Sequence, residues 1–309
     1  MRAAGAAVLV ALLLAGCGGG PSGTLRAQKP SRTASPGVAL DLGTAPSPLA
    51  VRLSDPLDTV HVRFRPPPAA GLLFDVNTGR VLWRLHPNRR RRIASLTKMM
   101  TAIVVDERIR AGRKVAISRR ALDTTGSAVG MFKPGERIGV STMLYGLLLP
   151  SGNDAARALA EGAARGSINR FVRYMNEAAL RLGLTCSRFS TPSGLEDAGN
   201  RSCAADLAAL AREVLRRPRL AAIVGHRSAV LPFPTKGGRI YLYNHNPLLL
   251  EGYPGTTGVK TGYTDAAGAC FVATARRGAV ELGVVLLGSP DIDGQARELL
   301  DRGFASIGA

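Results

Sequence analysis

The chain has 309 residues, 46% of them hydrophobic, which is enough to bury a sizeable core in one large domain or two smaller ones. Its formal net charge of +19 favours contact with anionic partners. The four cysteines and four histidines lack the spacing of metal ligands, so we expect no metal site of that type.

The first 17 residues, MRAAGAAVLVALLLAGC, resemble a bacterial export signal. The apolar stretch 6–14 follows Arg2 and is too short to span a bilayer as a mature helix. Small residues directly before Cys17 resemble a lipobox, in which that cysteine is lipidated and becomes the new N-terminus. We therefore expect a lipoprotein signal peptide at 1–16, and an exported protein that acyl chains on Cys17 hold to the outer face of the cell membrane. A plain signal peptide with an incidental cysteine is the alternative.

Residues 17–65 are predicted to form a flexible tether, because Gly, Pro, Ser and Ala dominate most of them. The alternating stretch TVHVRFR at 59–65 is compatible with an edge strand at the end of this tether. A folded domain is expected over 66–309. It begins with a β-hairpin, in which GLLFDV and RVLWRL flank the turn residues at 77–79.

Four arginines at 89–92 form the densest basic patch of the chain. An exported protein seldom meets nucleic acid, so we expect no nucleic-acid partner. Anionic lipid head groups or acidic wall polymers fit this charge better. A solvated loop is the competing interpretation of the run.

A long helical region follows. The stretch 96–105 is apolar around much of its circumference, which predicts a central buried helix. Further helical patterns lie at 140–149, 154–164, 168–182 and 205–217. Strand patterns return at 239–244, 255–260, 268–277 and 279–288, and the pattern at 291–307 predicts a closing helix. We therefore expect an α+β fold, with an antiparallel sheet flanked by helices and an inserted all-helical lobe at about 95–225.

Three short motifs occur in order along this domain. They are Ser95-Leu96-Thr97-Lys98, Ser151-Gly152-Asn153 and Lys260-Thr261-Gly262. Each is common alone, but their order and spacing together are typical of serine–lysine acyl transfer.

The spacing of the first motif suits a nucleophile and its base. On a helix, residues three apart share a face, so Lys98 can reach the hydroxyl of Ser95. A lysine can remove that proton only if its pKa is lowered, and both burial and a second cation, Lys260, would lower it. The N-terminus of the helix at Ser95 favours the negative charge that develops there.

The other two motifs supply the remaining functions of such a site. Residues two apart in extended backbone face the same side, so Ser151 can relay a proton to the leaving amine while Asn153 holds the substrate amide. A strand end at 260–262 suits a terminal carboxylate, which Lys260 and Thr261 would bind, and Gly262 would permit close approach of the backbone. The backbone N–H groups of Ser95 and Tyr263 would form an oxyanion hole.

With these motifs, the chain resembles the serine-type D-alanyl-D-alanine carboxypeptidases of the low-molecular-mass penicillin-binding protein family. The segments ASLTKMMTA, LLLPSGNDAARALAE, FVRYMNEAALRLGL, PSGLEDAGN and VKTGYTDAAGACFVATARR also resemble that family, and the likeness runs from about residue 69 to 304. It implies a β-lactamase- and transpeptidase-like fold and a catalytic domain at 66–309. It also implies an acyl-enzyme on Ser95 that releases the terminal D-alanine of a peptidoglycan stem peptide. β-Lactams would be covalent inhibitors, and no cofactor is expected.

Three features go beyond the common pattern of that family. Familiar members continue into a β-rich domain and an anchoring helix, a role that lipidated Cys17 would take here. His245 occupies a place where some members carry an arginine near the substrate carboxylate, and it is either a substrate ligand or a structural imidazole. Cys186 and Cys203 are candidates for a disulfide because an exported protein permits one, whereas Cys270 lies in an apolar run and is expected to be buried.

Several alternatives use the same motifs. A D,D-endopeptidase would use the same residues. A β-lactamase needs a carboxylate to activate the deacylating water, and 184–188 contains none, while Glu196 follows a turn and does not fit. A non-catalytic wall-binding or β-lactam-sensing lipoprotein would suit the basic surface, but it would not need the Ser95/Lys98 pair.

Overall fold

The computed structural model describes residues 47–55, 58–195, 199–234 and 238–309. The predicted signal peptide, Cys17 and the tether up to residue 46 lie outside these ranges. Among the described residues, no helix is long and apolar enough to cross a membrane.

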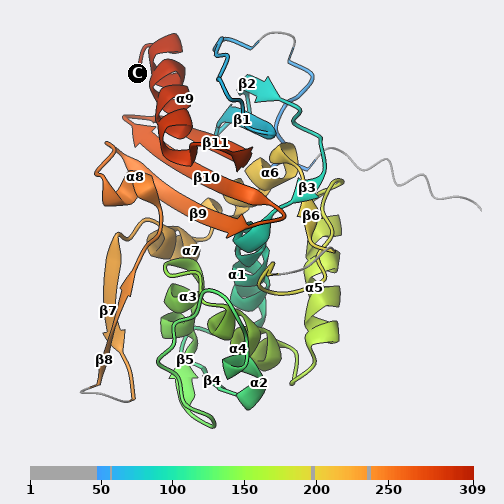
Figure 1. The fold of residues 1–309 in the computed structure, drawn as a ribbon, viewed down its shortest axis with the longest axis vertical. Helices are drawn as coiled ribbons and strands as arrows, with labels where there is room; N and C mark the ends of the chain where they lie inside the picture. The colour runs from blue at the N-terminus through green and yellow to red at the C-terminus, as the bar shows by residue number, and fades with distance from the viewer. Residues whose placement is uncertain (1–46, 56–57, 196–198, 235–237) are drawn as a thin grey trace, which may run out of the picture. The chain divides into compact units, whose positions relative to one another are not determined.

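A five-stranded antiparallel sheet forms one part of the fold, in the order β2-β1-β11-β10-β9 (Figure 1). Its strands are β1 Ala70–Asp75, β2 Val81–Leu85, β9 Thr256–Thr264, β10 Gly268–Arg277 and β11 Val280–Ser289. The predicted hairpin β1–β2 is confirmed. Its turn is closed by a hydrogen bond of 2.7 Å from the Thr78 N–H to Asp75 Oδ1, and Gly79 takes the positive φ of 75° that the turn requires.

Alternate residues of this sheet belong to two separate hydrophobic cores. On β11, Leu282, Val284 and Leu286 pack with the closing helix α9, Ile292–Ser306. Val285 and Leu287 point the other way, into the core that the sheet shares with the helical lobe. Because side chains alternate across a strand, one continuous apolar strand contributes to both layers.

The helical lobe lies between β2 and β9 in the chain and is built around α1 (Figure 1). All residues of α1 from 97 to 105 are buried, which confirms the predicted central helix. The lobe comprises α1 Thr97–Arg108, α2 Arg119–Leu122, α3 Val140–Leu148, α4 Asn153–Ala163, α5 Ile168–Arg181, α6 Ala204–Arg216 and α7 Pro218–Val224. A short 3-10 helix, η1 Ala94–Leu96, leads into α1, and the small pair β4 Lys114–Ala116 and β5 Arg137–Gly139 lies near α4.

The boundary predicted for the tether was wrong at its C-terminal end. Leu49 and Val60 are 4% and 3% exposed, so the segment from residue 47 packs against the domain instead of continuing a free linker to 65. The Val60 N–H donates to the Leu82 carbonyl at 2.9 Å, yet residues 59–65 form no strand. A few apolar side chains are enough to hold this Pro-rich segment on the fold.

Two further strand pairings and one short helix complete the described part of the fold. The pattern at 239–244 was predicted as a strand, and it forms a hairpin that projects from the body of the domain (Figure 1). The elements are β3 Arg91–Arg92 paired with β6 Arg201–Ser202, β7 Ser228–Pro232 paired with β8 Arg239–Tyr243, and α8 Pro247–Leu250.

A disulfide joins Cys186 to Cys203, with Cα atoms 5.6 Å apart. It links the segment after α5 to the residue directly before α6, across 17 positions of the chain. Cys270 is a free, buried thiol, as expected.

We predict that the double substitution Cys186→Ser/Cys203→Ser lowers the free energy of unfolding by about 3 kcal/mol, because the open chain regains the entropy that the closed loop removes. Urea unfolding of the oxidised protein and of the variant measures the difference. Adding a reductant should weaken the oxidised protein and leave the variant unchanged. Equal stabilities of the oxidised protein and the variant would show that the bridge does not restrain the unfolded chain.

Candidate active site

Ser95 and Lys98 meet where η1 passes into α1. Lys98 is fully buried, and its Nζ lies 2.7 Å from Ser95 Oγ. The preceding residue, Ala94, has a φ of 47°, a left-handed conformation that is unfavourable for a residue with a Cβ. Such strain persists where the surrounding structure enforces it, and here it presents the serine hydroxyl to the lysine amine.

The amine of Lys98 is held by neutral groups. It donates to Asn153 Oδ1 at 2.7 Å and to the Ser193 carbonyl at 3.1 Å. Burial lowers its pKa well below the ordinary value, the nearby Lys260 ammonium lowers the pKa further, and Asp154 opposes both effects. A neutral amine beside a serine hydroxyl can accept its proton.

The second motif turns sharply into helix α4. Ser151 has a φ of 63°, and its Oγ is buried without a hydrogen-bond partner among the described residues. A Cβ on Gly152 would lie 2.6 Å from Asp154 Oδ1 and 3.0 Å from the Gly146 carbonyl, so no side chain fits there. The motif therefore presents an unpartnered hydroxyl from a rigid turn.

Asn153 was predicted to hold a substrate amide, but both polar atoms of its side chain are engaged within the protein. Its Oδ1 accepts from Lys98, and its Nδ2 donates to the Thr125 carbonyl at 2.7 Å. In this structure Asn153 therefore positions the Lys98 amine.

The third motif lies on β9, the edge strand that packs against η1. A Cβ on Gly262 would lie 2.9 Å from the Ser95 backbone nitrogen, so only glycine lets the strand come this close. The approach brings together the backbone segments of Ser95 and Tyr263, which were the predicted oxyanion donors. The side chain of Tyr263 is 67% exposed, and its hydroxyl donates to Asp265.

Lys260 is only 2% exposed, and its Nζ donates to the Thr261 carbonyl at 2.9 Å. Burial lowers the pKa of Lys260 to about 7. The exposed His245 is close enough for the Lys260 charge to lower the pKa of its imidazole, in addition to the larger effect of partial burial. Around neutral pH this imidazole is therefore uncharged, and it would contribute hydrogen bonds instead of a positive charge.

Several positioning residues were not predicted from the sequence. The Ser193 carbonyl accepts from Lys98, and a Cβ on Gly194 would lie 2.0 Å from the Ala94 carbonyl oxygen. The buried Asp154 accepts from the N–H groups of Val129 and Gly130, each at 3.0 Å, and so ties the segment before α3 to α4. The residues Pro-Ser-Gly at 192–194 indicated a turn in the sequence. The sequence did not indicate that this turn contacts Lys98.

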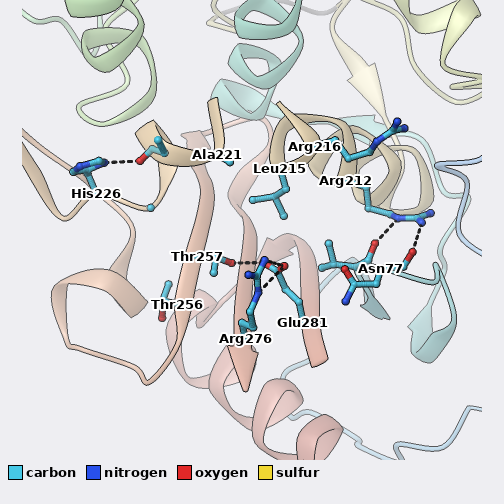
Figure 2. Close-up of a pocket in the computed structure, with 13 residues that line it drawn as sticks. Asn77, Arg212, Leu215, Arg216, Ala221, His226, Thr256, Thr257, Arg276 and Glu281 are labelled. Carbon is cyan, nitrogen blue, oxygen red and sulfur yellow. Dashed lines mark hydrogen bonds and ion pairs between the residues drawn. The ribbon is translucent and has the colours of Figure 1, made fainter. Parts of the chain in front are cut away.

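A cavity of about 560 Å³ lies elsewhere, between α6, α7 and the sheet (Figure 2). None of the three motifs lines it. Arg212 donates to the carbonyls of Val76 and Asn77, and the buried Glu281 accepts from Thr257 and Arg276. Arg212, Arg276 and Glu281 are thus occupied by contacts within the protein itself.

The chain matches a family model described as D-alanyl-D-alanine carboxypeptidase over residues 68–291. It is 35% identical over 244 residues to the D-alanyl-D-alanine carboxypeptidase DacF of Bacillus subtilis (strain 168), covering 76% of this chain and 62% of the relative. It is 36% identical over 247 residues to DacB2 of Mycobacterium tuberculosis (strain ATCC 25618 / H37Rv), covering 77% and 83%. The chain thus spans about three fifths of the length of DacF.

Solved structures give the same result. The Streptomyces K15 DD-transpeptidase superimposes with a TM-score of 0.72 at 31% identity, covering 77% of this chain and 97% of that chain. A D-alanyl-D-alanine carboxypeptidase from Mycobacterium tuberculosis H37Rv gives a TM-score of 0.72 at 34% identity, covering 77% and 91%. The expected α+β fold, with its antiparallel sheet and its likeness to transpeptidases, is confirmed.

We predict that Lys260→Met has a higher free energy of unfolding than the wild type at pH 7. This difference between the two proteins should become smaller toward pH 10. The folded pKa of Lys260 is about 7, whereas an unfolded lysine titrates near ~10.4, so the unfolded chain binds more protons in this window. The free energy of unfolding of the wild type therefore rises with pH between the two pKa values. The variant lacks this pH-dependent change, because it has no lysine at 260. Urea unfolding of both proteins at intervals from pH 6 to 10 measures the gap. A gap that does not change with pH would show that Lys260 keeps its proton in the folded state.

Proposed function

The chain belongs to the D-alanyl-D-alanine carboxypeptidase family, and we propose that it releases the terminal D-alanine of peptidoglycan stem peptides through an acyl-enzyme on Ser95. The observation that carries this proposal is the fully buried Lys98 amine, 2.7 Å from the Ser95 hydroxyl. A buried amine with a lowered pKa at this distance from a hydroxyl is the base that a serine nucleophile needs.

Acylation begins when Ser95 Oγ attacks the carbonyl carbon between the two D-alanines and Lys98 accepts the hydroxyl proton. Negative charge on the carbonyl oxygen is stabilised by the N–H groups of Ser95 and Tyr263. The C–N bond then breaks, and the departing D-alanine amine takes a proton through Ser151. The buried, unpartnered Ser151 hydroxyl supports this role, because an unsatisfied buried hydroxyl is costly unless it serves a function.

Deacylation repeats these steps with water as the nucleophile. Lys98 accepts the proton of the water, the ester bond to Ser95 breaks, and Lys98 returns the proton to the Ser95 oxygen. A β-lactamase needs a carboxylate to activate the deacylating water, and no described carboxylate hydrogen-bonds to Lys98. β-Lactams would therefore acylate Ser95 and leave slowly, which disfavours the β-lactamase alternative.

The terminal carboxylate of the substrate would bind at the end of β9. The charge of Lys260 is available there, with the Thr261 hydroxyl and the His245 imidazole beside it. Since His245 is neutral, the attraction for the carboxylate depends on the Lys260 proton.

We also propose that the protein is exported and lipidated at Cys17, so that it acts on the outer side of the cell membrane. The support is the sequence of the first 17 residues, which lie outside the described part of the chain.

Transpeptidation is a second candidate, because one similar structure is named a DD-transpeptidase. The same acyl-enzyme would then transfer to an amine of another stem peptide. Measuring released D-alanine and the amide product, with and without an added amine acceptor, separates this reaction from hydrolysis.

We predict that Ser95→Ala abolishes covalent labelling by a fluorescent penicillin and the release of D-alanine from a D-Ala-D-Ala-ended peptide. Lys98→Ala should slow acylation about 10²–10⁴-fold, the usual contribution of a general base. The exposed Lys114→Ala serves as the matched control and should label at the wild-type rate. Normal labelling of a folded Lys98→Ala protein would remove this lysine from the role of base.

We predict that kcat/KM falls as the pH rises through about 7, because Lys260 then loses the proton that attracts the substrate carboxylate. Lys260→Arg keeps its charge at all accessible pH values, so its alkaline decline should move to higher pH. Initial rates at low substrate concentration, from pH 5.5 to 10, give both profiles. Identical alkaline declines in the two proteins would assign the titration to another group.

A further inference from the structure

A second cavity, of about 740 Å³, is lined by three arginines. Arg90, Arg188 and Arg201 converge on it, with Asn176, Cys186, Ser187 and Gly199 forming the rest of the wall. Arg90 belongs to the arginine run that the sequence singled out, and the steps proposed for the reaction at Ser95 use none of these three side chains.

The backbone holds the three arginines in place. Arg188 and Arg201 exchange two backbone hydrogen bonds, of 2.8 and 2.9 Å, and Arg201 also pairs with Arg92 across β3 and β6. The disulfide closes the chain two residues outside this pair, at 186 and 203. Arg90 donates to the Thr185 carbonyl at 2.7 Å. The backbone positions of the three arginines are therefore fixed, while their exposed side chains can turn toward a ligand.

The charge of this pocket is not balanced within the described part of the chain. None of the three guanidinium groups forms an ion pair with a described carboxylate. The buried Asp206 accepts from the Cys186 N–H at 2.7 Å and the Ser187 hydroxyl at 2.8 Å, and it feels the charge of Arg90 without forming an ion pair with it. Burial raises the pKa of Asp206, so its charge is held less firmly than that of an exposed carboxylate.

The same loop links this pocket to the catalytic lysine. Arg188 and Arg201 pair at the base of the loop, and farther along it the carbonyls of Pro192 and Ser193 accept from Thr101 and Lys98. The six residues from 188 to 193, with five steps between them, span at most about 18 Å. An extended peptide of about six residues can therefore have its C-terminus at Ser95 and its other end at the arginines.

We infer that this arginine pocket binds a carboxylate carried by an acidic residue of the substrate peptide, upstream of its D-Ala-D-Ala end. Guanidinium groups bind carboxylates through paired, charge-assisted hydrogen bonds, and three of them here face a space open to a ligand. This assignment rests on the proposed function, because it describes a second contact for the same substrate.

The test compares two acetylated six-residue peptides that end in D-Ala-D-Ala and differ only by Glu or Gln at the second position. The wild type should process the Glu peptide with about tenfold higher kcat/KM, mainly through a lower KM, as expected for one charge-assisted contact. Arg188→Gln/Arg201→Gln should bring this ratio to about one without changing the rate for the Gln peptide. Arg188→Glu/Arg201→Glu should favour a Lys peptide instead.

Two controls accompany these variants. Arg110→Gln/Arg113→Gln removes the same charge from exposed positions beyond the far end of α1 and should keep the wild-type ratio. Labelling of Ser95 by a fluorescent penicillin should be unchanged in all variants, which shows that the fold and the catalytic groups remain intact.

Equal turnover of the Glu and Gln peptides by the wild type would overturn the pocket assignment and leave the carboxypeptidase assignment standing. Absence of D-alanine release from both peptides, together with absence of penicillin labelling, would overturn the proposed function itself. If the arginine substitutions weakened sedimentation of the protein with purified cell walls but left the peptide ratio unchanged, the pocket would bind a wall polymer, and the substrate assignment would be wrong.

Discussion

The burial of the Lys98 amine is the constraint on which the rest of the site depends. A charged ammonium is costly to place at 0% exposure, so the fold must either pair it with a carboxylate or let it lose its proton. The structure surrounds it with a hydroxyl, an amide oxygen and a carbonyl, and Lys260 provides a second positive charge nearby. These surroundings lower the pKa of Lys98, and an amine that has lost its proton next to Ser95 is a base.

The architecture explains how such a site is kept rigid. Glycines at 152, 194 and 262 each leave space where a Cβ would meet backbone or a buried side chain, so α4, the segment 188–195 and β9 all reach the Ser95–Lys98 corner. The left-handed conformations of Ala94 and Ser151 are held by this packing. These unfavourable backbone conformations lower the stability of the fold, but they fix the geometry at both serines. Such a loss of stability is a recurring property of functional sites.

The sequence predicted most of the site because its chemistry is local. Ser95 and Lys98 share a helical face, and each of the other motifs is a continuous tripeptide, so the order and spacing of the three motifs together indicated the groups involved. The contact between Lys98 and Ser193 could not be predicted from the sequence. Ser193 is 95 positions away, and it accepts through its backbone carbonyl, which every residue has. Composition indicated a tether to 65, but single apolar residues such as Leu49 bind to the domain. The β7–β8 hairpin was missed because the short, proline-containing β7 was not predicted as a strand.

The insertion of the helical lobe between β2 and β9 has a consequence for how the protein opens. Both ends of the lobe are anchored in the same sheet, so a lobe that separates transiently cannot diffuse away, and its local concentration near the sheet stays high. Reclosure is then a short intramolecular search that returns α1 to the same edge of β9. A protease that cuts one exposed loop of the lobe would leave the second attachment intact, and the nicked enzyme would still hold its nucleophile against the strand that binds the substrate.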